Sequence, residues 1–485
     1  MVFSLRLPEE DRALLILLAL AFLATRLPVL GYLPFVQDEG IYAIMIDEQA
    51  QHPTLVPTFL GHEVSWKPAP FFWAYAALSR LPLPLEIAYR FPSLLFGLLT
   101  IFPLYHLMRN ATGAGPKTAF AATLAFLLSS VSIYPDTSLL TDTLSFLFIC
   151  SSLYLYTEKK FDDKRFIAAG ALAAAAFSIK LVVAGIVPVL AVAYFWFRGE
   201  KDVLSRPLFL ASLLGVPLAA AVVFVSLQGG SMAHQLFFSD IIGHLIGAQS
   251  PSGPRDLPNI VASIAFASPG PWLLLSLIGV AKFWRTERFM ALWWLILIFP
   301  MSASVFQPWY YLPVMPAIAY FAVRAVERRG ITGAAIFAMC AMLALALLLF
   351  TDGLSYQQYM PQKEAGMLLA GKENALVIGN YAPGIAAYKM ATEQRTLGRT
   401  LDFGWVLTPP GFRDLGEFSR DYWTAKYPVQ DGSFGGMFTT GDIFRKETNI
   451  TKFQYIAISS QGDYSVTGAE KLMDSPSIKV YRVGG

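Results

Sequence analysis

The stretch RALLILLALAFLATRLPVLGYLPFVQDEGIYAIMIDEQAQ, residues 12–51, joins a long apolar run to an acidic pair, Asp38 and Glu39. The apolar run, 12–30, is long enough to cross roughly 30 Å of hydrocarbon as a helix. It lacks the small-residue cleavage site of a signal peptide, which predicts a first helix that is retained. The sequence therefore predicts a membrane crossing that is followed, about ten residues on, by two adjacent carboxylates.

The rest of the chain has the composition of a polytopic membrane protein. Of its 485 residues 55% are hydrophobic and only 15% are charged, and the mean hydropathy is +0.50. Such a chain is too apolar for a soluble enzyme. Its net charge of +3 is small and is not gathered into a basic patch, so no nucleic-acid partner is expected. The two cysteines, Cys150 and Cys340, lie in apolar runs and predict no disulfide framework.

A window of about 20 residues finds eleven candidate membrane spans. The run from 166 to 197 has the length of one long helix, but the charges of the neighbouring loops require a break at Lys180. The predicted spans are 12–30, 88–108, 118–134, 139–157, 166–180, 181–197, 207–226, 269–283, 289–306, 310–323 and 331–350.

Basic residues predict the orientation of these spans in the plasma membrane. Every second loop carries at least two Lys or Arg, as in EKKFDDKR and RGEKDVLSR, whereas the long loops 31–87 and 227–268 carry very few. Because short cytoplasmic loops are enriched in basic residues, the N-terminus is expected in the cytoplasm. Eleven spans then place the C-terminus outside the cell.

The composition changes after residue 351. Residues 352–485 contain no long apolar run, and NALVIGNYAPGIAAYKM, FQYIAISS and IKVYRV are typical of strands and of a strand–turn–helix unit. We therefore expect two domains, a transmembrane domain over 1–351 and a small extracytoplasmic α/β domain over 352–485.

The first outer loop, 31–87, contains two amphipathic stretches, EGIYAIMIDEQA and PFFWAYAALSRL. Both are typical of helices that lie in the interface between lipid and water. Asp38 is explained either as an N-cap or as a chemical group held at head-group depth. Lys67, at the start of the second stretch, is either a snorkelling anchor or a ligand for an anionic phosphate.

Further charges lie near the outer ends of the spans. Asp142 enters an apolar run, where a carboxylate is costly unless it is paired, hydrated or bound to metal, and this makes it a functional candidate. Asp136 is placed in a short outer turn, which a Pro-Asp pair explains equally well. For Arg90 and Lys180 snorkelling is the alternative to a functional role. Together these groups suit a site for an anionic lipid and a proton-bearing acceptor.

Several short motifs occur in the order of a known family. They are DEGIY, WKPAPFFWAYA, RFPSLLFG, TDTLSFLF, Pro271 with Trp272, and YLPVMPAIA. Over roughly residues 12–325 the chain resembles the GT-C class of membrane glycosyltransferases, specifically the protein O-mannosyltransferase and aminoarabinose-transferase (ArnT-like) superfamily. The resemblance implies transfer of a sugar from a polyprenyl-phosphate donor to a lipid, glycan or protein acceptor at the outer membrane face, with inversion.

The resemblance also assigns roles to residues. Asp38 matches the catalytic base, Glu39 is its neighbour in the motif, and Asp142 matches the second acid. The cations expected to bind the donor phosphate are Lys67, Arg90 and Lys180. The expected acceptor or sugar pocket comprises Tyr42, Glu63, Asp136 and Tyr311.

Three features limit the assignment. This chain has Trp-Lys-Pro-Ala at 66–69 where the aminoarabinose branch has Glu-Lys-Pro-Pro, so a divalent metal stays an open question, with Asp38, Glu63 and Asp142 as candidate ligands. The Trp-Trp-Asp signature of oligosaccharyltransferases is absent, which disfavours en bloc glycan transfer. No nucleotide-binding loop is present, so no nucleotide is expected. The alternative function is that of a secondary transporter or a flippase for lipid-linked glycans.

Overall fold

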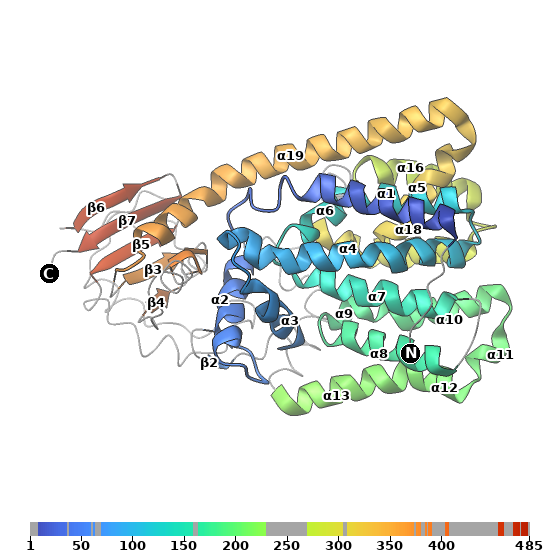
Figure 1. Cartoon of the computed structure of the whole chain (residues 1–485), viewed down its shortest axis with the longest axis horizontal. Coiled ribbons are helices and arrows are strands. Elements are labelled where there is room, and N and C mark those ends of the chain that lie inside the picture. The colour runs from blue at the N-terminus through green and yellow to red at the C-terminus, as the bar shows by residue number, and fades with distance from the viewer. Residues whose placement is uncertain are drawn as a thin grey trace. The chain divides into compact units, whose positions relative to one another are not determined.

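The computed structural model describes most of the helical half and parts of the C-terminal region (Figure 1). Its residues form two compact units, Met1–Leu30 with Lys67–Phe71 and Arg90–Thr351, and Gly31–Trp66 with Phe72–Tyr89 and Asp352–Gly485. The described residues are 8–35, 38–59, 62–63, 69–158, 163–228, 269–303, 308–372, 375–379, 384–385, 387–389, 403–406, 454–459, 469–475 and 477–483.

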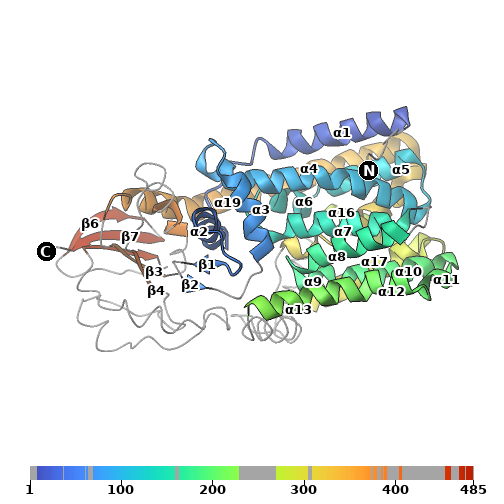
Figure 2. The ribbon, with the colours of Figure 1, turned by 60° about the horizontal axis from the view of Figure 1, so that its bottom comes forward.

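The first unit is helical, and α1, α4 and α7 run side by side in both views (Figures 1 and 2). Two of its helices, α4 and α19, also contribute residues to the second unit. The elements are α1 Glu9–Arg26, α4 Leu85–Thr112, α5 Pro116–Leu127, α6 Ser130–Asp136, α7 Thr141–Thr157, α8 Asp163–Phe177, α9 Leu181–Ala184, α10 Ile186–Arg198, α11 Lys201–Leu204, α12 Pro207–Leu210, the π-helix η1 Ala211–Gly215, α13 Val216–Gln228, α16 Pro271–Phe283, α17 Arg288–Ala303, the 3₁₀ turns η4 Pro308–Tyr311 and η5 Glu327–Arg329, α18 Met315–Val326 and α19 Gly330–Leu368.

Local sequence explains where several of these helices begin and end. Pro116 and Pro271 occupy the first position of α5 and α16, where a missing N–H costs nothing. Gly199 ends α10 in the left-handed conformation, with φ of 77°. The predicted break at Lys180 is confirmed, because α8 ends at Phe177 and α9 begins after Lys180.

Each of the eleven predicted spans contains a helix, and several differ from the prediction in extent or continuity. The span predicted over 118–134 is two helices, α5 and α6, bent by 64°. The bend follows from Ser129, whose side chain accepts a hydrogen bond from the Ser132 N–H and caps α6. The last predicted span ends at 350, whereas α19 continues to Leu368.

Within the described residues, α4 alone is both long and apolar enough to cross a membrane by itself. The bent pair α5 and α6 passes the same test if it is counted as one span, and several other apolar helices are shorter. The full set of eleven crossings therefore stays a prediction.

The second unit combines α2 Asp38–Gln51, the hairpin of β1 Thr58–Phe59 and β2 His62–Glu63, and most of α3 Ala69–Ser79 with a five-stranded sheet. Both stretches predicted to be helical in the first outer loop are helices, and β1 packs beside α2 (Figure 2). The sheet has the order β4-β3-β5-β7-β6, with β4, β3 and β5 parallel and β7 antiparallel to both of its neighbours. Its strands are β3 Ala375–Gly379, β4 Phe403–Val406, β5 Tyr455–Ser459, β6 Ala469–Asp474 and β7 Ile478–Val483.

The three strand predictions for the C-terminal region are confirmed by β3, β5 and β7. Ile456 and Ala457 of β5 and Val480 of β7 are fully buried. The parallel and antiparallel pairs in one sheet are typical of a mixed α/β arrangement. The boundaries of an independent domain over 352–485 and its side of the membrane stay predictions.

Candidate functional site

An ion pair between Asp142 and Lys180 lies at one end of the first unit. Asp142 is the second residue of α7 and is 6% exposed, and Lys180 stands in the link between α8 and α9. The Lys180 ammonium donates to Oδ1 of Asp142 at 2.6 Å and lies 4.8 Å from the ring centroid of Tyr310. Because a buried carboxylate is costly unless it is paired, Lys180 explains how α7 tolerates an acid in its first turn.

The same pair leaves Lys180 able to bind a further group. An ammonium has three N–H donors, and the hydrogen bond to Asp142 uses one of them. The Lys180 side chain is 21% exposed, so its head is accessible. Asp142 and the Tyr310 face hold this cation in one place, which suits a group that stabilises negative charge as it develops.

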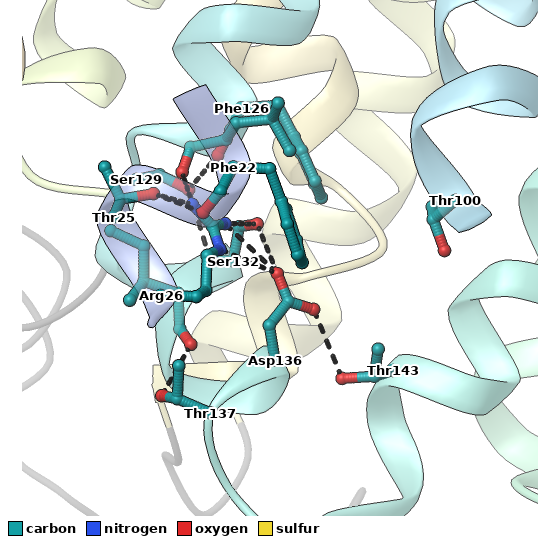
Figure 3. A network of polar contacts seen from close by, with 12 residues as sticks. Phe22, Thr25, Arg26, Thr100, Phe126, Ser129, Ser132, Asp136, Thr137 and Thr143 are labelled. Atoms are coloured by element: carbon teal, nitrogen blue, oxygen red, sulfur yellow. Dashed lines mark hydrogen bonds and ion pairs between the residues drawn. The ribbon is translucent and has the colours of Figure 1, made fainter. Parts of the chain in front are cut away.

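A second ion pair, between Arg26 and Asp136, is buried, and Figure 3 shows its polar contacts. Arg26 ends α1 and is completely buried, and its Nε and Nη2 donate to Oδ2 of Asp136 at 3.2 and 3.1 Å. Its remaining donors reach Ser132 Oγ at 2.7 Å, Thr25 Oγ1 at 2.7 Å and the carbonyl oxygen of Leu127 at 2.6 Å. This guanidinium therefore ties α1 to the bend between α5 and α6.

The structure corrects the placement of Asp136. It is the last residue of α6 rather than part of a turn, and its side chain points into the unit. Thr143 donates to its second oxygen at 3.4 Å, and a Cβ on Gly97 would come within 2.5 Å of that oxygen. Both oxygens accept hydrogen bonds from the protein, which favours a structural role for Asp136 over contact with an acceptor.

The two ion pairs belong to one region of the first unit. Thr143, which donates to Asp136, directly follows Asp142 in α7. Tyr134 of α6 stacks on Trp309 of η4, with ring centroids 5.2 Å apart, next to the Tyr310 that faces Lys180. The start of α7, the Lys180 link and η4 therefore converge around one partly exposed cation.

Two further predicted residues lie in this unit. Arg90 of α4 is 1% exposed and donates to the carbonyl oxygen of Leu30 at 3.3 Å. Tyr311 ends η4 and is fully buried. Lys67 lies outside the described residues, and Glu63 is on β2, where only the backbone is described.

The predicted acids of the first outer loop belong to the second unit. Asp38 and Glu39 are the first two residues of α2, Asp38 half-buried and Glu39 fully buried. Carboxylates at this position are stabilised by the N-terminal end of the helix dipole. Tyr42, one turn on, is buried and meets Phe72 of α3 edge-on, with centroids 6.0 Å apart, so α2 and α3 pack together.

The described residues do not provide a metal site. No group of three or more His, Cys, Asp or Glu side chains among them could hold an ion. Of the three candidate ligands, Asp142 is already paired with Lys180, and the Glu63 side chain is not described. We therefore derive no step through a metal.

A cavity of about 350 Å³ lies elsewhere in the first unit, between the ends of α4, α10 and α17. It contains none of the predicted site residues. Burial raises the pKa of Glu287 in its wall, although a hydrogen bond from Tyr320 and the charge of Arg324 oppose that shift. Its basic lining residues are Arg198, Arg285 and Arg288.

Sequence reasoning missed two residues of the site, Arg26 and Tyr310. Arg26 lies inside the predicted first span, and a cation at such a position requires an anionic partner. That requirement was the available signal that Arg26 is paired, although it does not identify Asp136 as the partner. Tyr310 is one of several aromatic residues in its segment, and nothing in the sequence distinguishes it.

Comparison with known proteins supports the predicted resemblance. Residues 67–225 match the dolichyl-phosphate-mannose-protein mannosyltransferase family, a range that holds Lys67, Arg90, Asp136, Asp142 and Lys180. No curated protein matches the sequence at a significant level. The crystal structure of ArnT from Cupriavidus metallidurans bound to undecaprenyl phosphate is 13% identical, and each chain is covered over 97% of its length with a TM-score of 0.64. The chain therefore resembles the protein O-mannosyltransferase and ArnT-like GT-C glycosyltransferases, and its fold is similar to that of ArnT.

A second structure agrees with this GT-C fold. The oligosaccharyltransferase of Archaeoglobus fulgidus, crystallised with zinc and sulfate, is 12% identical, with 92% of this chain and 68% of that chain covered and a TM-score of 0.52. The ArnT crystal structure in the apo state gives a TM-score of 0.64 at 14% identity. The predicted resemblance to the O-mannosyltransferase and ArnT-like GT-C proteins is therefore confirmed.

Proposed function

We propose that this protein is a GT-C glycosyltransferase that transfers a single sugar from a polyprenyl-phosphate donor to a hydroxyl-bearing or amine-bearing lipid, glycan or protein acceptor at the outer membrane face. The observation that carries the proposal is the partly exposed Lys180, held by Asp142 and Tyr310 at one end of the helical unit. The ArnT relative was crystallised with undecaprenyl phosphate, which supports a donor of that class.

The reaction needs a base for the acceptor's proton and a cation that stabilises the negative charge on the departing phosphate. In the proposed mechanism Asp38 accepts the proton of the acceptor as its oxygen or nitrogen attacks the anomeric carbon. The bond from that carbon to the phosphate oxygen breaks, and its electron pair leaves with the polyprenyl phosphate. Lys180 binds the phosphate, whose charge grows in the transition state, and a single displacement inverts the anomeric centre.

The remaining predicted residues have supporting roles in this proposal. Lys67 and Arg90 add positive charge for the donor phosphate, and Arg90 also donates to the carbonyl of Leu30. Tyr42 contributes to the packing of α2, which carries the base. Glu39 serves mainly as a buried carboxylate at the start of that helix.

A transfer assay with the purified full chain tests the proposal. The protein is placed in liposomes that contain polyprenyl-phosphate sugars with labelled mannose or aminoarabinose, and acceptors of the three classes are added. We expect label to move to an acceptor with at least one donor. The proposal would be contradicted if protein that shows a thermal unfolding transition, and is therefore folded, transferred no sugar from any polyprenyl-phosphate donor.

Removing the Lys180 charge tests the donor-phosphate assignment. We expect Lys180→Met to reduce kcat/KM for the donor by about 100-fold, because one preorganised donor is worth about that much in a transition state. Asp142→Asn keeps the cation but removes its fixed partner, so a smaller loss of about tenfold is expected. The matched control is Lys201→Met, which removes an exposed cation of α11 that lies over the ring of Trp196 in α10. Wild-type kcat/KM in Lys180→Met would refute the assignment.

A further inference from the structure

The backbone of Phe35, three positions before Asp38, is bound on both sides by residues from the C-terminal part of the second unit. Its N–H donates to the hydroxyl of Tyr388 at 2.7 Å, and the Gln362 side-chain amide donates to its carbonyl oxygen. The rings of Phe35 and Tyr388 also stack, with centroids 4.9 Å apart. Because buried backbone groups must be paired, these two contacts fix the chain just before α2.

A second set of contacts holds Tyr388 itself. Its hydroxyl accepts from Phe35 and donates to Oε1 of Glu86 at 3.1 Å, so both of its hydrogen-bonding functions are used. Lys363, the residue after Gln362 in α19, forms an ion pair with the same Glu86 oxygen. Glu86 is only 6% exposed. The first outer loop is thus tied to α19 and to Tyr388 through a connected network of buried polar groups.

Two glycines permit this arrangement. A Cβ on Gly384 would come within 2.2 Å of Oε1 of Gln362, the side chain that binds Phe35. A Cβ on Gly366 would come within 2.5 Å of the Cβ of Tyr388. The segment that carries Tyr388 can therefore approach α19 only because both positions lack a side chain.

We propose that Gln362 and Tyr388 are positioning residues that fix Phe35 and thereby set the place of Asp38 at the start of α2. This inference rests on the proposed function of Asp38 as the base. By this inference the C-terminal region helps to position the base, and this role is separate from any part that the region has in selecting the acceptor. A base must stand within hydrogen-bonding distance of the proton it takes, so a small displacement of α2 is expected to slow the reaction.

Hydrogen exchange in the full chain measures the positioning directly. Tyr388→Phe keeps the ring stack but removes the hydroxyl, and Gln362→Met removes the amide at nearly constant volume. Each removes one hydrogen bond to the backbone of Phe35, so we expect exchange of the amides at the start of α2 to rise about 5- to 100-fold. The matched control is Tyr356→Phe; Tyr356 lies in α19, as Gln362 does, and its ring stacks on Tyr32. Exchange that stays at the wild-type and control rate in both variants would overturn the inference.

Kinetics separate this inference from the proposed function. With Tyr388→Phe and Gln362→Met we expect kcat to fall about tenfold while the donor KM stays within about twofold, because the Lys180 region is untouched. Gly384→Ala is expected to reproduce the kinetic effect through Gln362. Faster exchange with unchanged kcat, in a protein that Asp38→Asn inactivates, would refute the positioning role and leave the base intact. Full activity of Asp38→Asn would refute the base, whatever the exchange rates.

Discussion

Asp38→Asn is expected to lower kcat for sugar transfer by about 10²- to 10⁴-fold, because it removes the proposed base and keeps the size of the side chain. Asparagine is also accepted at a helix start, so α2 should still begin at residue 38. Binding of the donor depends on Lys180 and the other cations, and we therefore expect the donor KM to change little. The measurement is the initial rate of label transfer at saturating donor and acceptor.

The matched control for that experiment is Asp47→Asn. Asp47 lies in the same helix, is half-buried and carries the same charge, but it is more than two turns from Asp38. We expect this variant to retain transfer within about twofold of the wild type. An Asp38→Asn protein with the same kcat as the control would exclude Asp38 as the base.

Asp136→Leu is expected to destabilise the protein by about 3–5 kcal/mol, because it leaves the buried Arg26 charge without its partner. Arg26 is completely buried and would keep only its hydrogen bonds to neutral oxygens. The expected result is a clearly lower midpoint of thermal unfolding in detergent. We expect this loss of stability even where the donor KM is unchanged. A midpoint equal to that of the wild type would show that the pair contributes no stability.

A double variant and an exposed pair serve as controls for this prediction. Arg26→Met combined with Asp136→Leu removes both charges, so most of the lost stability should return. Arg198 and Glu200 form an ion pair of similar length, 3.0 Å, with side chains 42% and 29% exposed. Glu200→Gln is expected to cost less than about 1 kcal/mol, since solvent screens that pair.

The helices of this protein were largely predictable because hydropathy and loop charge act over short distances in sequence. The break at Lys180 is an example, since the basic loops on either side required it and α8 and α9 are separate helices. The start of α2 at Asp38 also follows from local signals, an acidic pair before an apolar stretch. Alternating apolar residues in the same way predicted β5 and β7.

The pairings within the candidate site could not be predicted in the same way. Arg26 and Asp136 are 110 residues apart, and Lys180 and Asp142 are 38 apart. Sequence identifies each charge as costly in an apolar run but does not say which partner satisfies it. Phe35 and Tyr388 show the same limit, since a backbone N–H has no sequence signature. Such contacts depend on packing between distant segments, which periodicity does not encode.

The most direct test of the central claim is the chemical fate of the donor after incubation with the full chain in sealed liposomes. A transferase breaks the bond between the anomeric carbon and the phosphate, whereas a transporter or flippase moves the lipid-linked sugar intact. We expect free polyprenyl phosphate and an acceptor that carries the sugar with inverted anomeric configuration, as measured by mass spectrometry and NMR. Recovery of the donor intact, but on the opposite leaflet, would contradict the account.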